Sequence, residues 1–184
     1  VTLDTPAIEY IGNRCFKNCN KLTSIGFSQN VKEIGVGAFA FTGLSTADFP
    51  NASIGSSTFE GSNVVVAKIN KAENLERTFC ECELLSSLTA PNLKNIGNFS
   101  FYNCKSLGNI NLNNVQSVSN YAFANSGIKT ADLPNCTFLG NAVFNKCDDL
   151  VSVNIPLVTK IMPEEFNYCT SLKKINMPNV ETFD

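Results

Sequence analysis

The sequence predicts an α/β repeat protein, a single solenoid domain over residues 1–184 built from about eight units of 20–23 residues. Three observations lead to this fold class. A landmark phenylalanine recurs at spacings of 23, 20, 20, 22, 22, 21 and 22 residues, at Phe16, Phe39, Phe59, Phe79, Phe101, Phe123, Phe144 and Phe166. An Ile-Gly pair or its equivalent precedes most landmarks, as in Ile96-Gly97, and an apolar alternation follows, as in Ile110-Asn111-Leu112. Self-similarity at such a period is the signature of stacked units.

The alternation after each landmark predicts the strands. Within the motif L-x-x-I-x-L, typical of solenoids of the leucine-rich kind, the last triplet alternates with period two, which indicates a half-buried strand. One strand per unit, all in the same direction, predicts one parallel sheet on the concave face of the coil. A proline, which has no N–H to continue a ladder, follows several triplets, at Pro50, Pro91, Pro134, Pro156 and Pro178. An asparagine, whose side chain can bond neighbouring backbone at a corner, follows most of these prolines.

The return path of each unit runs from the Ile-Gly pair to the landmark phenylalanine. Glycine there lets the backbone take conformations that other residues resist. The four or five residues between the pair and the landmark suffice for one helical or 3₁₀ turn, but not for a long helix. We therefore expect a thin convex side made of short 3₁₀ or helical turns.

Taken in order, the units are not all alike. At the N-terminus only Val1 to Leu3 could form a strand, and the next unit should point Phe16, Leu22, Ile25 and Phe27 inward. The units at Phe39, Phe59 and Phe123 are one residue shorter between landmark and strand, and the unit at Phe79 is the least regular. The chain ends at Phe183-Asp184 without a polar cap, which solenoids normally need. We expect a domain truncated at both ends that stacks onto flanking repeats or domains.

Eight cysteines raise the question of disulfides. Five of them stand three residues after a landmark, where the other units carry Thr42, Ser62 and Ser126, at Cys19, Cys82, Cys104, Cys147 and Cys169. A place shared by Cys, Ser and Thr predicts a small inward side chain that reaches a backbone carbonyl. The alternative is a disulfide between neighbouring units, such as Cys82 with Cys104 or Cys147 with Cys169, which needs Cα atoms about 5.5 Å apart.

Composition excludes several classes of partner. A net charge of −2 gives no electrostatic footprint for nucleic acid or an anionic membrane. No apolar run reaches the length of a membrane span. The chain opens at Val1-Thr2-Leu3 without the basic and apolar regions of a signal peptide.

Catalysis is not expected either. The chain has no histidine, which removes every Ser-His, Cys-His and His-metal arrangement. Cys80-Glu81-Cys82-Glu83 is the one thiol and carboxylate cluster, and it lacks a second cysteine pair at metal spacing. No glycine loop for phosphate appears. We predict a protein that is not an enzyme and uses no cofactor and no metal.

The polar face of the predicted sheet is the candidate binding surface for a protein or glycan ligand. It combines the polar position of each strand triplet with the column that flanks it, and the candidates are Asp48, Lys68, Thr89, Asn109, Asn111, Thr130, Asp132, Ser152, Asn154, Lys174 and Asn176. These columns contain no Tyr, Trp or Arg, the usual anchors of tight interfaces, so weak or multivalent contact is expected. The alternative is that these side chains are only the solvated face of a sheet.

The pattern I-G-x-x-A-F-x-x-C-x-x-L-x-x-I-x-L-P-x-x-V, seen over Ile34–Phe39 and Ile161–Val180, closely resembles the BspA-like leucine-rich repeats across essentially the whole chain. The resemblance implies a right-handed solenoid with a binding role. It also implies an extracellular or cell-surface location, because members are typically surface or secreted proteins of host-associated bacteria and some protists, implicated in adhesion.

Three functions from different classes follow. The leading hypothesis is a non-catalytic, adhesin-type module that binds a host or neighbouring-cell protein or glycan through the concave sheet. The second is a structural spacer or assembly scaffold that presents other domains. The third, an intracellular scaffold for protein interactions, would fit free thiols.

Overall fold

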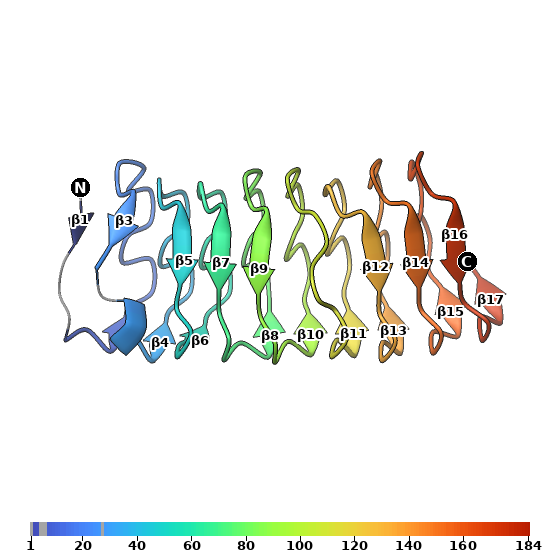
Figure 1. Ribbon diagram of the computed structural model, residues 1–184, viewed down its shortest axis with the longest axis horizontal. Coiled ribbons are helices and arrows are strands. Elements are labelled where there is room, and N and C mark those ends of the chain that lie inside the picture. Colours follow the sequence, from blue (N-terminus) through green and yellow to red (C-terminus); the bar gives the residue numbers. More distant parts are fainter. Residues whose placement is uncertain (1, 4–6, 27) are drawn as a thin grey trace.

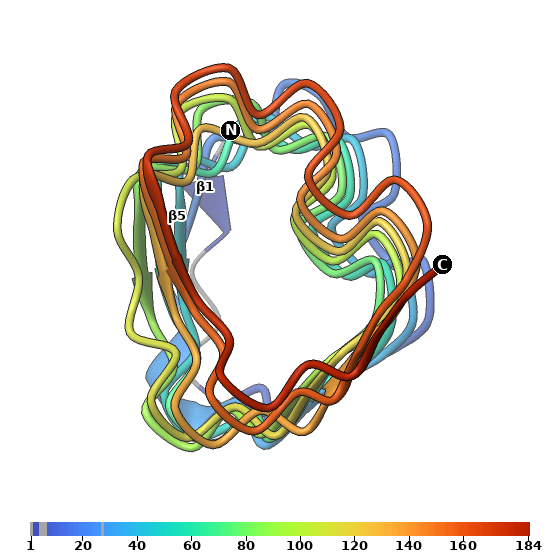
Figure 2. The ribbon, with the colours of Figure 1, turned by 90° about the vertical axis from the view of Figure 1, so that its right-hand side faces the viewer.

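The computed structural model describes residues 2–3, 7–26 and 28–184 and forms a solenoid of parallel strands. Figure 1 shows its turns side by side in chain order, so that each turn contacts its neighbours along the chain. Seen nearly along the axis in Figure 2, the turns superpose as similar outlines, with β5 on one side and the C-terminal strand on another. The predicted leucine-rich solenoid of about eight turns is confirmed.

The first side of the coil, here called the triplet face, carries the strands that the sequence predicts. Its strands are β1 (Thr2–Leu3), β3 (Ser24–Ile25), β5 (Thr46–Asp48), β7 (Val66–Lys68), β9 (Ser87–Thr89), β12 (Thr130–Asp132), β14 (Ser152–Asn154) and β16 (Lys174–Asn176). These strands pair in parallel, in the hydrogen-bonded orders β1-β3, β5-β7-β9 and β12-β14-β16. Two expected positions, Val1 and Phe27, lie outside the described residues.

A second side, here called the doublet face, was not predicted as a sheet. Its two-residue strands are β2 (Tyr10–Ile11), β4 (Glu33–Ile34), β6 (Ser53–Ile54), β8 (Asn74–Leu75), β10 (Asn95–Ile96), β11 (Ser117–Val118), β13 (Phe138–Leu139), β15 (Lys160–Ile161) and β17 (Thr182–Phe183). They pair in parallel as β2-β4-β6, β8-β10-β11-β13 and β15-β17. The isoleucine of the Ile-Gly pair therefore ends a short strand, and the prediction of a single sheet per coil is corrected to two strand columns.

The third side, here called the turn side, holds the landmark phenylalanines and is not helical. Within the described residues one 3₁₀ segment occurs, η1 (Ser28–Asn30), so the α/β class and the 3₁₀ turns on a convex face are not confirmed. The reason is a pair of left-handed residues in each turn, two positions before and two after the landmark. They are Arg14, Gly37, Ser57, Arg77, Phe99, Tyr121, Ala142 and Glu164 before it, and Asn18, Phe41, Gly61, Glu81, Asn103, Asn125, Lys146 and Tyr168 after it.

These left-handed residues direct alternate N–H groups toward the next turn. In the turn of Phe101, the N–H groups of Phe99, Phe101 and Asn103 donate to carbonyls of the following turn, those of Asn120, Ala122 and Ala124, at 3.1, 2.7 and 3.0 Å. The residues between them donate three positions back within the same turn, as Tyr102 does to Phe99. A 3₁₀ helix needs consecutive right-handed residues, so it cannot continue through this alternation.

The core is a column of landmark rings along the axis. Neighbouring rings are stacked with centroids 5.1–6.0 Å apart from Phe16 through Phe166. The rings from Phe39 to Phe144 have no exposed surface, and the apolar residues of both strand faces pack around them. Because each ring contacts the rings of the turns before and after it, no turn completes its own core.

The triplet face is interrupted in one place. The triplet Ile110-Asn111-Leu112, predicted as a strand, has no strand hydrogen bonding, and β9 and β12 are consequently not joined in one sheet. In Figure 2 the yellow-green trace of this region lies outside the line of its neighbours. The Asn111 side chain accepts the N–H of Asn113 through Oδ1 at 3.0 Å, a local turn contact where other units carry proline.

Candidate functional site

The structure places the predicted binding residues in two rows on the triplet face. Thr46, Val66 and Ser87 pair in register in one row, and Asp48, Lys68 and Thr89 in the other. After the interruption the rows continue with Thr130, Ser152 and Lys174 and with Asp132, Asn154 and Asn176. The residue between the rows points inward, as Ala67 and Val153 do. The alternation of apolar and polar residues therefore predicted correctly which side chains of these six strands point outward.

Asn109 and Asn111 are the exception, since they lie outside any strand. Asn109 still joins the first row, because its Oδ1 accepts the hydroxyl of Thr130 at 2.9 Å. Asn111 bonds its own turn instead of a neighbouring strand.

Several polar side chains of this face form hydrogen bonds to side chains of neighbouring turns. Asn154 donates to Asp132 and Asn176 donates to Asn154, each at 2.7 Å, which makes a side-chain ladder over three turns. Gln29 donates to Asp48 Oδ2 at 3.0 Å, while Asp48 Oδ1 is buried without a hydrogen-bond partner. The rows are therefore pre-organised, with fewer free donors than their residue types suggest.

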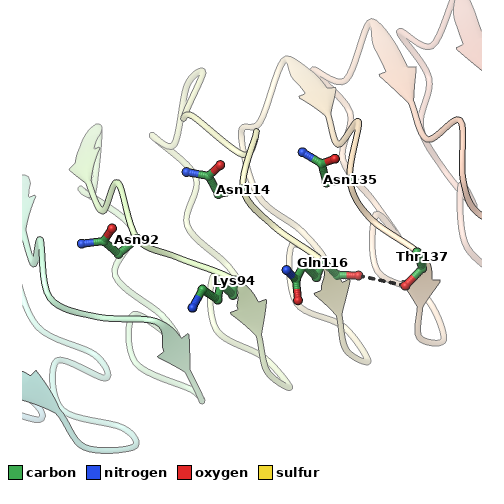
Figure 3. A pocket seen from close by; sticks show the side chains of 6 residues that line it. All are labelled: Asn92, Lys94, Asn114, Gln116, Asn135 and Thr137. Atoms are coloured by element: carbon green, nitrogen blue, oxygen red, sulfur yellow. Dashed lines mark hydrogen bonds between the residues drawn. The ribbon is translucent and has the colours of Figure 1, made fainter.

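A second candidate surface is a groove that the sequence did not predict. It runs along the corner where the triplet face meets the doublet face, and we call it the corner groove. Its central part has a volume of about 480 Å³ and is lined by Asn92, Lys94, Asn114, Gln116, Asn135 and Thr137. Figure 3 shows the three asparagines in one row and Lys94, Gln116 and Thr137 in a second row beside it. Two further hollows lie on the same corner, one at Pro50, Asn51, Asn70, Lys71 and Asn92, and one at Leu157, Thr159 and Pro178–Glu181.

The asparagine row of the groove is fixed by backbone contacts. Asn92, Asn114 and Asn135 each donate their Nδ2 to a carbonyl of the preceding turn, at Asn70, Pro91 and Asn113, over 2.7–2.9 Å. Asn51 and Asn179 do the same on the outer turns. The predicted corner role of these asparagines is thus borne out. The signal for the groove was present as this recurrent asparagine, and the second wall is the polar residue two positions later, directly before each strand of the doublet face, which the sequence did not predict.

The turn side carries a group of aromatic and basic side chains that are exposed or half-buried. Arg77, Phe99 and Tyr121 occupy the same place in three successive turns. The guanidinium lies 5.4 Å from the Phe99 ring centre, and the two rings stack at 5.2 Å. Arg77 also forms an ion pair with Glu60 at 2.6 Å, and this hydrogen bond raises the pKa of Arg77. Lys17 over Phe41 and Lys146 over Tyr168 repeat the cation–ring contact.

The cysteines are free thiols, which supports the prediction of small inward side chains over the disulfide alternative. The prediction is wrong for Cys19, which is exposed. Cys82, Cys104, Cys147 and Cys169 donate their Sγ–H to the landmark carbonyl of the preceding turn at 2.9–3.1 Å. Burial raises the pKa of Cys82 to about 12 and that of Cys80 to about 11. At neutral pH these groups are thiols, so they are poor nucleophiles and poor metal ligands.

Over residues 2–3, 7–26 and 28–184, no three or more Cys, Asp or Glu side chains are grouped so that they could hold a metal ion. In the same part of the chain, no helix is long and apolar enough to cross a membrane.

Comparison with known proteins gives the family. The BspA type leucine-rich repeat region matches residues 1–66 and 75–184, in six copies. The interval left between the two matched ranges directly precedes the turn of Phe79, the least regular of the chain. No curated protein matches the sequence.

Three solved structures share the fold. A leucine-rich repeat protein from Bacteroides ovatus is 23% identical with a TM-score of 0.68, covering 100% of this chain and 62% of that chain. The pneumococcal vaccine antigen PcpA is 20% identical with a TM-score of 0.61, over 98% of this chain and 56% of that one. The T. pallidum leucine-rich repeat protein TpLRR is 20% identical with a TM-score of 0.60, over 96% and 78%.

The chain thus spans about three fifths of the length of the first two structures. Proteins built from such repeats generally serve as non-catalytic interaction modules, and no enzyme family is indicated. With the repeat profile matching nearly all of its length, the chain belongs to the BspA-type leucine-rich repeat family.

Proposed function

We propose that this solenoid is the binding part of a secreted or cell-surface protein, and that it engages a protein or glycan of a host or neighbouring cell through the triplet face. The observation that carries the proposal is the pair of in-register polar rows, Asp48-Lys68-Thr89 and Thr130-Ser152-Lys174 among them. At about 4.8 Å per strand, these rows offer the same geometry turn after turn. A repetitive partner can use that geometry at many points.

The rows favour avidity over tight single contacts. They present hydroxyl, amide and single charged groups and lack the aromatic and arginine anchors that dominate strong interfaces. Several weak contacts along one rigid coil add up when the partner also repeats. The surface location is supported by family membership, since the related repeats occur in surface and secreted proteins.

Charge reversal on the triplet face tests the proposal. The variant Asp48→Lys, Lys68→Glu, Asp132→Lys changes three outward residues of β5, β7 and β12 while leaving the inward residues intact. We expect binding to host cells and immobilised matrix proteins or glycans to fall at least tenfold. A control that reverses outward Glu33 and Lys160 on the doublet face should bind as the parent does. Unchanged binding by the triplet-face variant, with its thermal unfolding intact, would exclude this surface.

A spacer function is the second candidate, and one observation favours it. The ladder Asp132-Asn154-Asn176 turns its polar groups toward each other, as expected if the face only holds the coil together. A spacer would keep its activity after removal of two whole turns, whereas a binding face would lose contacts in proportion.

An intracellular scaffold is favoured by one other observation, the free state of all eight cysteines. Thiols persist in reducing compartments. A secretion signal or wall anchor found in the gene that encodes this chain would argue against that location.

A further inference from the structure

The corner groove is a second surface whose chemistry differs from that of the triplet face. Its central hollow and the hollow at Asn51 and Lys71 share Asn92, so the two adjoin along the corner. The groove therefore follows the solenoid axis over several turns, and an occupant would be an extended chain.

One wall of the groove is a row of hydrogen-bond acceptors. Because Nδ2 of Asn92, Asn114 and Asn135 is held by the preceding turn, the Oδ1 of each amide is fixed. No described residue donates to these oxygens, and all three side chains are exposed. The result is one free carbonyl acceptor per turn, at intervals of about 4.8 Å.

The other wall supplies donors. Lys94 contributes an ammonium and Gln116 an amide, while the Thr137 hydroxyl, which donates to the Gln116 carbonyl at 3.5 Å, offers its oxygen as an acceptor (Figure 3). Lys94 bonds Glu73 at 2.9 Å, so its charge is balanced within the protein. A hydroxyl group both donates and accepts, and a chain of hydroxyls would match the two walls together.

The surroundings argue against other extended ligands. The balanced Lys94–Glu73 pair gives no cationic track for phosphates. The backbone N–H groups of Lys94, Gln116 and Thr137 already donate to the preceding turn at 2.7–3.0 Å, so a peptide strand could not add to this edge. The central walls hold only polar side chains, which gives a peptide no apolar anchor site.

We propose that the corner groove, from Asn92 to Thr137, binds a neutral polysaccharide whose chain lies along the solenoid axis. The site is independent of the triplet face, so it adds a glycan track to whatever that face engages.

The experiment is affinity electrophoresis of the whole chain in gels that contain mannan, β-glucan or galactan, with bovine serum albumin as the non-binding reference. The parent should be retarded by at least one of the three. The variant Gln116→Leu, Thr137→Val removes the amide and the hydroxyl from one wall and leaves the asparagine bonds to the backbone in place. We expect its apparent dissociation constant to rise about tenfold or more.

Three results would overturn the inference. The first is no retardation of the parent in any of the three gels. The second is equal retardation of parent and groove variant. The third is loss of binding to an extended-peptide array by that variant without any effect on polysaccharide. The triplet-face charge-reversal variant must keep its retardation, which separates this test from that of the proposed function. Urea unfolding of each variant confirms that the coil is intact, and Asn114→Ala, which removes one acceptor, gives a second readout on the opposite wall.

Discussion

At the scale of single residues, the left-handed positions of the turn side carry backbone strain. Fourteen of the sixteen are not glycine, and each such residue costs roughly 1–2 kcal/mol in this conformation. The conformation persists because it satisfies backbone N–H groups between turns, as at Phe99 and Asn103. The strain is therefore offset by hydrogen bonds that no turn could make alone.

Gly37 offers a direct test of this strain. Its φ is +61°, and a Cβ added there would meet only Arg14 Cγ at 3.6 Å, an ordinary contact. Gly37→Ala should therefore destabilise by about 1 kcal/mol for conformational reasons alone. Gly108→Ala is the matched control, since its Cβ would meet nothing within 4 Å and its φ is not in the left-handed region. Urea unfolding midpoints compare the two, and equal midpoints would contradict this account.

Glu165 makes stability depend on pH. It is 2% exposed, its Oε2 accepts the Val143 N–H at 3.1 Å, and its Oε1 is unpartnered. Desolvation raises the pKa of this carboxyl from 4.5 to about 8. Between these values the unfolded chain releases the proton while the folded chain keeps it, so this residue's contribution to stability falls as pH rises through that window.

The substitution Glu165→Gln should remove that dependence. We expect the variant to exceed the parent in unfolding free energy by on the order of a few kcal/mol at pH 8.5, and to match it within about 1–2 kcal/mol at pH 4.5. Urea titrations between these pH values provide the measurement. Parallel pH profiles for parent and variant would show that the carboxyl is ionised in the folded protein.

Residue patterns predicted the inward side chains but not the backbone conformation. The landmark phenylalanines and the Cys, Ser or Thr column were readable because their side chains are constrained by packing. The left-handed positions show no sequence pattern: residues such as Arg14, Tyr121 and Ala142 share no property, and glycine occupies only two of the sixteen. The conformation there is imposed by neighbouring turns.

At the scale of elements, the phenylalanine column acts as a shared core. Phe101 stacks on Phe79 at 5.8 Å and on Phe123 at 5.1 Å and has no exposed surface, whereas Phe16 is half-buried and stacks on Phe39. Phe101→Ala should cost about 3–5 kcal/mol. Phe16→Ala should cost roughly 1–2 kcal/mol, because less apolar surface is lost. Denaturant unfolding measures both, and equal losses would mean that the column does not act as one core.

The strand columns show which elements a sequence can reveal. Strands of the triplet face were found because three alternating residues and a following proline leave a signal. The doublet face was missed because two residues are too few to show a period, and the pairing of Ile96 with Val118 depends on the register of whole turns. At Ile110-Asn111-Leu112 the alternation is present but no strand forms, and the Asn111 side chain instead accepts the Asn113 N–H within its own turn.

At the scale of the whole molecule, the corner groove arises only when both strand columns are in place. Each turn supplies both walls from one Asn-x-polar segment between its two strands, as in Asn92-Leu93-Lys94, and the groove forms only when successive turns stack. The triplet face, by contrast, is formed by a single strand column, and its outward residues could each be predicted from the sequence. The sequence therefore identified this candidate surface, whereas the corner groove, which lies beside a strand column that was not predicted, was missed.

The stacking of equivalent turns predicts that a turn can be removed in register. Asn95 pairs with Ser117 and Ile96 with Val118, so deleting residues 97–118 removes one complete turn of 22 residues. The deletion also removes Asn109–Asn111, the segment that separates β9 from β12. The shortened chain should fold, with β9 beside β12 in a continuous triplet face, because stability is a sum of contacts between neighbours.

Deleting residues 97–107, half of that turn, is the matched control. It removes Phe101 and breaks the turn that joins the turns before residue 97 to those after residue 107, although the later turns keep their register with one another. We expect the whole-turn deletion to retain strand-type circular dichroism and a single cooperative urea transition, and the half-turn deletion to lose the single transition, because the stacking is interrupted at Phe101. If the half-turn deletion unfolded as cooperatively as the whole-turn deletion, the turns would not be the units of stability, because cooperative folding would then survive an interruption of the stacking at Phe101.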